Sequence, residues 1–254
     1  MNADLTSDYA IELNGVGLEI PINTREIRTL KKALVRSFTG GNLSKTTSGS
    51  KIVALDSISV SIKHGERVAL IGHNGAGKTT FLRVVSGIYQ PSYGSLKLGC
   101  KVHPMIQKAF ITGPDLSGYQ AVMGYYLLMN GNTRGFREYA EEVIEFSELG
   151  DFIHLPLKGY SEGMSARLLF SLLTSVKHEC LALDEGFGTG DARFFKRAQR
   201  RLEGFIGSAG TLLLASHSEE LLNRFCTRGL VFREGRLVYD GEVDEALKFY
   251  NEEN

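Results

Sequence analysis

The sequence predicts an α/β fold in which short buried strands carry polar residues to one edge of a parallel sheet. Residues 67–71, 179–185 and 211–217 each contain a short, almost continuous apolar run, which is typical of strands buried on both faces. A glycine-rich loop follows the first run, the second ends in two carboxylates and the third ends in a histidine. Because open α/β sheets bind ligands at the carboxyl ends of their strands, we expect these three segments to form one site.

The glycine-rich loop lies between the first strand and a predicted helix at 79–86, and it has the form of a P-loop. The pattern G-x-x-x-x-G-K-[ST] is filled by Gly72, Gly77, Lys78 and Thr79. Glycines let the backbone turn tightly enough for successive N–H groups, with the helix N-terminus behind them, to face phosphate oxygens. Lys78 is expected to reach the β- and γ-phosphates, and the Thr79 hydroxyl is expected to hold Mg²⁺. The predicted nucleotide-binding residues of this loop are Gly72, His73, Asn74, Gly75, Ala76, Gly77, Lys78, Thr79 and Thr80.

The second and third strands supply further predicted catalytic groups. Asp184 is expected to hold Mg²⁺ through water, and Glu185 is expected to orient or deprotonate the attacking water. The chain between Glu185 and His217 is long enough for one helix between adjacent parallel strands, which would bring His217 beside the γ-phosphate. Glu185, His217 and Lys78 are therefore the predicted catalytic residues, while Asp184 and Thr79 are predicted metal ligands. A solvated acidic turn and a structural histidine are the alternatives.

A fourth motif, YSEGMSAR at 160–167, stands between the P-loop and the acidic strand and opens a predicted helix that continues over 168–176. A serine and a glycine at a helix start can bind an anion, although an ordinary N-cap has the same composition. With these four motifs in this order, nearly the whole chain resembles the ATP-binding subunit of ABC transporters. The resemblance implies a RecA-like P-loop NTPase core, with a small antiparallel β-subdomain and a helical subdomain.

The resemblance also implies an ATPase that binds ATP and Mg²⁺ between two copies of the chain. In this family the signature usually reads L-S-G-G-Q, so that Tyr160, Glu162 and Met164 are departures here. Ser161 and Gly163, the groups that touch the γ-phosphate in the family, remain. Because one subunit's signature covers the nucleotide on the other's P-loop, the implied assembly is a head-to-tail homodimer that holds two ATP. One chain alone is expected to hydrolyse ATP poorly.

Two loop residues are assigned by the same resemblance. Residues 188–191 take the place of the family's D-loop, and Asp191 is predicted to belong to the nucleotide site. Gln107 is the predicted Q-loop glutamine, which would approach Mg²⁺ and the permease. Gln120 is the competing choice for this role, and a surface position is the alternative for Gln107.

The departures in the signature indicate one branch of the family. The segments 142–153, 158–164 and 188–191, with 226–232 followed by 235–241, resemble the ATPases that export O-antigen, capsule and teichoic acid. This resemblance implies a membrane permease as partner, a lipid-linked polysaccharide as indirect partner, and a peripheral location on the cytoplasmic face of the inner membrane. An ABC exporter of lipids or drugs is the nearest alternative. A soluble ABC ATPase acting on nucleic acid or ribosomes is the alternative in another class.

Two departures from the family limit what the resemblance implies. The aromatic residue that stacks on adenine is expected just before Ala54, yet residues 50–53 contain none, and Tyr9 and Phe38 are open as substitutes. Many O-antigen exporters also carry a C-terminal β-sandwich that recognises the modified end of the polymer, whereas this sequence stops at Asn254. We therefore expect no such carbohydrate-binding module in this chain.

Composition agrees with one ATPase domain over 1–254, because 254 residues that are 43% hydrophobic can bury a large core. The net charge of zero gives no support to nucleic-acid binding, so no nucleic acid is expected among the partners. The start is acidic and polar, so no signal peptide is expected, and no apolar run approaches the ~18 residues of a membrane span. The three cysteines are widely spaced and are expected to be buried thiols.

The expected organisation is a core at about 1–104 and 166–254, with a helical subdomain at about 105–165. Alternating residues at 10–20 and 52–62 predict the antiparallel strands, and residues 137–149 predict an amphipathic helix that packs internally. A basic insertion at 21–51 holds seven basic residues against one acidic residue. It is interpreted either as a solvated helix face or as a surface that attracts anionic headgroups or a lipid pyrophosphate.

Overall fold

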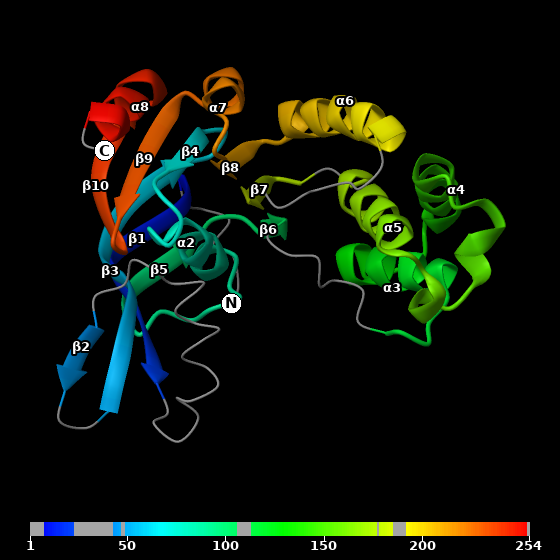
Figure 1. Ribbon diagram of the computed structural model, residues 1–254, viewed down its shortest axis with the longest axis horizontal. Helices are drawn as coiled ribbons and strands as arrows, with labels where there is room; N and C mark the ends of the chain where they lie inside the picture. The colour runs from blue at the N-terminus through cyan, green and yellow to red at the C-terminus, as the bar shows by residue number, and fades with distance from the viewer. Residues whose placement is uncertain are drawn as a thin grey trace. The chain divides into compact units, whose positions relative to one another are not determined.

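The computed structural model describes residues 8–22, 43–46, 49–105, 113–176, 178–184 and 192–252 (Figure 1). Its contacts divide the chain into two compact units. The first unit comprises Met1–Ile106, His178–Glu185 and Ala209–Asn254. The second unit comprises Gln107–Lys177 and Gly186–Ser208. Most of the predicted basic insertion, at 23–42 and 47–48, lies outside the described residues.

The first unit contains the predicted antiparallel sheet. Its four strands lie in the order β2-β3-β1-β5, where β1 is Tyr9–Ile22, β2 is Leu43–Thr46, β3 is Gly49–Lys63 and β5 is Tyr93–Leu98. Strands β1 and β3 pair over most of their length, with Leu13 opposite Val60. Both of these side chains are buried, as the alternating apolar residues require for a strand that covers a core with one face. The predicted antiparallel sheet is therefore confirmed.

The second sheet of this unit holds the three strands that the apolar runs predict. Its order is β10-β9-β4-β8-β7-β6, with β4 at Arg67–Ile71, β6 at Val102–Met105, β7 at Cys180–Asp184, β8 at Thr211–Ala215, β9 at Arg228–Arg233 and β10 at Arg236–Glu242. Only β10 runs antiparallel to its neighbour. Leu70 and Asp184 both lie opposite Ala215, so the ends of β4 and β7 flank the end of β8. The predicted convergence of these strand ends is confirmed.

Among the described residues, the first unit has three helices: α2 at Lys78–Val85, α7 at Glu219–Phe225 and α8 at Val243–Glu252. Helix α2 begins at the P-loop lysine and buries Phe81, Leu82 and Val85 completely. These side chains join residues of both sheets in one hydrophobic cluster, which holds the start of α2 at the edge of the parallel sheet. The three cysteines are buried and free, as expected.

The second unit is helical and has its own small core. Its helices are α3 at Gly118–Asn130, α4 at Phe136–Ser147, η1 at Gly150–His154, η2 at Leu157–Gly159, α5 at Glu162–Thr174 and α6 at Ala192–Ser208. Phe146 of α4 lies 5.9 Å from Phe170 of α5 and 5.5 Å from Phe194 of α6, measured between ring centroids. These aromatic contacts group α5 and α6 with α4, whereas the sequence-based division ended the helical part at about 165.

The predicted amphipathic helix at 137–149 is present as α4, Phe136–Ser147. It buries Tyr139 and Val143, and the Tyr139 hydroxyl donates to the Leu172 carbonyl at 3.1 Å, so its apolar face packs within the unit as expected. Among the residues that the structure describes, none of the helices is both long enough and apolar enough to span a bilayer.

Candidate nucleotide site

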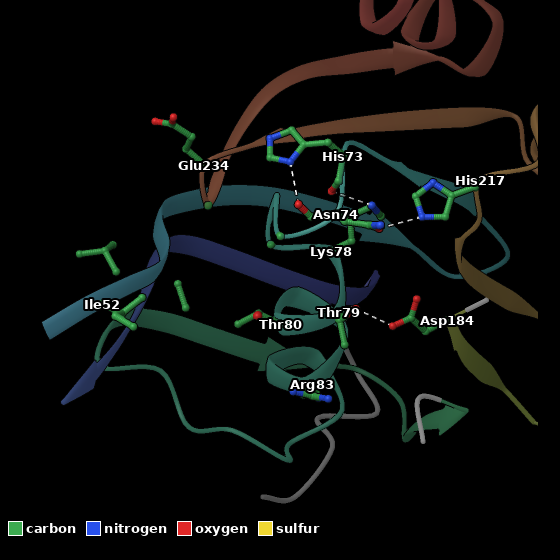
Figure 2. A pocket seen from close by; sticks show the side chains of 15 residues that line it. Ile52, His73, Asn74, Lys78, Thr79, Thr80, Arg83, Asp184, His217 and Glu234 are labelled. Carbon is green, nitrogen blue, oxygen red and sulfur yellow. Dashed lines mark hydrogen bonds between the residues drawn. The ribbon is translucent and has the colours of Figure 1, made fainter. Parts of the chain in front are cut away.

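A cavity of about 300 Å³ opens where the carboxyl ends of β4, β7 and β8 meet the start of α2 (Figure 2). The P-loop and the first turns of α2 line it, and Asp184 and His217 lie at one end. Residues 52–54 of β3 and the turn Glu234–Gly235 between β9 and β10 line the other end. All of these residues belong to the first unit.

Two P-loop glycines occupy backbone conformations that side-chain residues avoid. Gly72 has φ +148°, and a Cβ placed there would lie 2.5 Å from the carbonyl oxygen of Phe232. Gly77 has φ +114° and lies close to Gly235 and Leu55. The loop therefore turns against the β9 backbone without room for a side chain, which explains why the motif requires glycine at these positions.

Lys78 is the first residue of α2 and is 8% exposed. Its ammonium donates to the carbonyl oxygen of Gly72 and, at 3.1 Å, to that of His73. The charge thus lies inside the curve of the loop, at the positive end of the α2 dipole, where phosphate oxygens would meet it. This arrangement favours the binding of an anion with several oxygens, such as a nucleoside triphosphate.

Thr79 and Asp184 meet directly, although they are far apart in the sequence. The Thr79 hydroxyl donates to Asp184 Oδ2 at 2.5 Å, and the carboxylate stands at the end of β7. A hydroxyl and a carboxylate are hard oxygen ligands, and Mg²⁺ is usually bound by one or two such groups together with phosphate oxygens and water. The donor set therefore fits Mg²⁺, and the roles of Thr79 and Asp184 in holding it stay predictions.

His217 follows β8 and faces the P-loop. Its Nε2 lies 3.0 Å from Asn74 Oδ1 (Figure 2). Since an amide oxygen only accepts hydrogen bonds, Nε2 carries the proton in this contact. The ring therefore presents an N–H donor toward the P-loop, as stabilisation of charge on a phosphate requires. The contact with Asn74 is not contained in any single motif of the sequence.

The signature residues belong to the second unit. Ser161 is the N-cap of α5, and its hydroxyl accepts a hydrogen bond from Met164 N at 3.2 Å. A Cβ added at Gly163 would find only the Ser161 oxygen, at 4.0 Å, so the first turn of α5 has open space beside its backbone. This is the geometry of an ordinary N-cap and also of an unobstructed anion site, and the contact with γ-phosphate stays a prediction.

Three predicted site residues, Glu185, Asp191 and Gln107, lie outside the described residues, and their roles stay predictions. The competing glutamine, Gln120, is described. Its Oε1 accepts from Ser117 N at 2.9 Å in the capping box of α3, so this side chain is used to begin a helix.

The wall opposite His217 contains residues that sequence reasoning did not assign. Ile52, Val53 and Ala54 of β3 line the cavity where an aromatic residue was expected, and Glu234 and Gly235 lie across from them. Tyr9 does not line the cavity; it lies on β1 opposite Lys63. Phe38 lies outside the part of the chain that the structure describes.

Comparison with known proteins identifies the family of the chain. The sequence profile of the ABC transporter family matches residues 55–188. The O-antigen export system ATP-binding protein RfbE of Yersinia enterocolitica is 38% identical, over 90% of this chain and 96% of its own length. The teichoic acids export ATP-binding protein TagH of Staphylococcus haemolyticus is 28% identical, over 96% of this chain and 88% of its own length.

Solved structures show the same fold. An ATP-binding subunit of an ABC transporter superposes with a TM-score of 0.65 at 17% identity, covering 95% of this chain and 93% of that one. A dimeric ATP-binding cassette bound to ADP and Pi superposes with a TM-score of 0.63 at 17% identity, covering 92% and 98%. The chain therefore belongs to the ABC transporter family, as an ATPase whose relatives include proteins named for O-antigen and teichoic acid export.

Proposed function

We propose that this chain drives a membrane permease that exports a lipid-linked polysaccharide such as O-antigen. The observation that supports this most strongly is the 38% identity with RfbE along almost the full length of both chains. The signature Tyr-Ser-x-Gly-Met and its surroundings support the same branch of the family. In this proposal the chain is held at the cytoplasmic face of the inner membrane by the permease, and nucleic acid is not a partner.

The proposed cycle begins with ATP in the cavity. Lys78 would bind the β- and γ-phosphate oxygens, while Thr79 would hold Mg²⁺ and Asp184 would hold it through water. Mg²⁺ held there would neutralise charge that develops on the transferred phosphoryl group. His217 donates from Nε2 to the γ-phosphate, and Glu185 accepts a proton from the attacking water. Catalysis in this scheme is mainly positioning and charge stabilisation.

A second copy of the chain is proposed to complete each site. The P-loop lies in the first unit, whereas Ser161 and Gly163 begin α5 of the second unit. In the proposed head-to-tail homodimer, these two residues of one copy cover the γ-phosphate on the P-loop of the other. ATP binding closes the dimer and hydrolysis opens it, and the permease converts this movement into translocation of the polymer.

Replacing Lys78 with Ala in the cell tests the export function. Synthesis of the polymer on a lipid carrier does not require this ATPase, so lipid-linked polysaccharide should accumulate while surface polysaccharide disappears. Lys97→Ala is the matched control, because Lys97 is exposed and its ion pair with Glu12 is on the antiparallel sheet. Unchanged surface polysaccharide, with loss of drug resistance or of translation instead, would favour one of the alternative functions.

A further inference from the structure

The end of the cavity away from the phosphate-binding groups has two facing walls. Figure 2 shows Ile52 of β3 and Glu234 of the β9–β10 turn on the side opposite Asp184 and His217. Ile52 and Val53 offer aliphatic surface in the place where the resemblance predicts an aromatic ring. A purine base bound here would gain its affinity from apolar contact, which depends on close approach of both walls.

The two walls and the P-loop touch through their backbones. Asp56 N donates to the Gly235 carbonyl at 2.8 Å, and Gly235 N donates to the Ala76 carbonyl at 2.9 Å. A Cβ at Gly235 would lie 2.8 Å from the carbonyl oxygen of Ala54. The turn is therefore seated between β3 and the P-loop, and a shift of the turn changes the width of this end of the cavity.

The turn itself is in a conformation that needs support. Glu234 has φ +48° and Gly235 has φ +78°, so both residues lie in the left-handed region. Glutamate is disfavoured there, because Asn, Asp and Gly are the residues that this kind of hairpin turn prefers. The next residue, Arg236, connects the turn to β3 through its side chain.

Arg236 joins the turn to β3 through Asp56. Its Nε and Nη2 donate to Asp56 Oδ2 at 2.9 and 2.7 Å, and the Tyr93 hydroxyl donates to Asp56 Oδ1 at 3.0 Å. Asp56 thus ties β10, β3 and β5 together at one point. The side chain of Asp56 is 27% exposed and that of Arg236 is 68% exposed, so the pair is close to the surface and its contribution is moderate.

We propose that the Asp56–Arg236 ion pair is a positioning pair that fixes the separation of the β3 wall and the Glu234–Gly235 turn, and thereby sets the affinity of the cavity for a purine base. Neither residue lines the cavity, so the pair acts through Ile52, Val53 and the turn. This proposal rests on the chain being an ATPase that binds ATP. It does not depend on the proposed export function.

The test compares a ligand that has a base with one that has none. The dissociation constants of MgATP and of magnesium tripolyphosphate are measured by calorimetry on the parent chain and on Asp56→Asn, Arg236→Gln and the double variant. Each variant should bind ATP about fivefold more weakly, as expected for a near-surface ion pair, and should bind tripolyphosphate as the parent does. The double variant should be no worse than the single ones, because the two side chains act as a unit. In hydrolysis, KM for ATP should rise while kcat stays within about twofold.

The control is Asp240→Asn on the same hairpin. Arg228 donates to both oxygens of Asp240 at 2.7 Å, far along the hairpin from the cavity. This variant should lower the melting temperature but leave the ratio of the two dissociation constants unchanged. The proposal would be overturned if Arg236→Gln weakened the binding of ATP and of tripolyphosphate equally, or left the binding of ATP unchanged. It would also be overturned if Asp240→Asn showed the same selective loss of ATP binding. Because Arg236 is largely exposed, Arg236→Gln should fold even where Asp56→Asn does not.

Discussion

The two ends of the cavity are built in different ways. At the end with the P-loop, Asp184 and His217, called the phosphate end, individual side chains make the contacts: Lys78 lies within the P-loop, Thr79 contacts Asp184, and His217 contacts Asn74. At the base end, backbone contacts of the Glu234–Gly235 turn set the shape. Single substitutions at the phosphate end should therefore cost orders of magnitude in rate, whereas those at the base end should cost a few-fold in affinity.

The largest expected effect at the phosphate end is that of Glu185→Gln. Glutamine keeps the shape of the side chain but cannot accept the proton of the attacking water. Turnover should fall by about 10²–10⁴-fold while ATP binding persists, so an ATP-bound dimer should accumulate. Steady-state hydrolysis and size-exclusion chromatography with ATP measure both effects. Normal hydrolysis would remove Glu185 from its predicted role.

His217→Ala should have the next largest effect. It removes an N–H donor that faces the P-loop, and loss of one such donor typically lowers kcat by about 10²-fold. Asn74→Ala is the matched variant, because it leaves the histidine in place, removes its 3.0 Å contact and keeps the backbone N–H through which a P-loop residue binds phosphate. A loss of about tenfold or less is expected there. If both variants lower kcat equally, His217 acts by holding the loop rather than by contacting the phosphate.

A smaller effect is expected from Gly235→Ala at the base end. Gly65→Ala is its control, since Gly65 has φ +82° with nothing near its Cβ position, whereas Gly235 has φ +78° and the Ala54 oxygen at 2.8 Å. Both variants carry the conformational cost of about 1 kcal/mol, and the close approach adds about 1–3 kcal/mol only at Gly235. Thermal unfolding should separate them, and only Gly235→Ala should raise KM for ATP.

The smallest effect is a pH dependence at Asp56. The hydrogen bond from Arg236, followed by that from Tyr93, lowers the pKa of this carboxyl below its ordinary value of 3.8. A lowered pKa in the folded state gives stability that is present above pH 3.8 and is lost as pH falls through the folded pKa. Asp56→Asn should therefore lower the melting temperature by about 1–3 °C at pH 7, and the difference should shrink below pH 4. A difference in melting temperature that does not change with pH would mean that Asp56→Asn acts through packing instead.

The same contrast explains what the sequence could predict. The phosphate end could be predicted because Gly72, Gly77 and Lys78 belong to one contiguous motif. The apolar runs also indicate that Asp184 and His217 lie at the ends of buried strands. The contacts of Thr79 with Asp184 and of His217 with Asn74 depend only on these strand ends meeting.

The base end could not be predicted in this way. Asp56 and Arg236 are 180 positions apart, and their pairing depends on how the β9–β10 hairpin lies against β3. No local pattern contains that geometry. The grouping of α5 and α6 with α4 likewise depends on contacts of Phe146 with Phe170 and Phe194, which no local pattern contains.

Mixed dimers test most directly whether the phosphate end is completed by a second copy. Lys78→Ala removes phosphate binding in its own P-loop, and Ser161→Arg places bulk and charge where Ser161 would meet the other copy's nucleotide. Each homodimer should be inactive, with turnover at least about 10²-fold below the parent. An equal mixture should regain activity, because mixed dimers keep one intact composite site. If the mixture hydrolyses ATP no faster than the two homodimers, completion of the site by the second copy is contradicted.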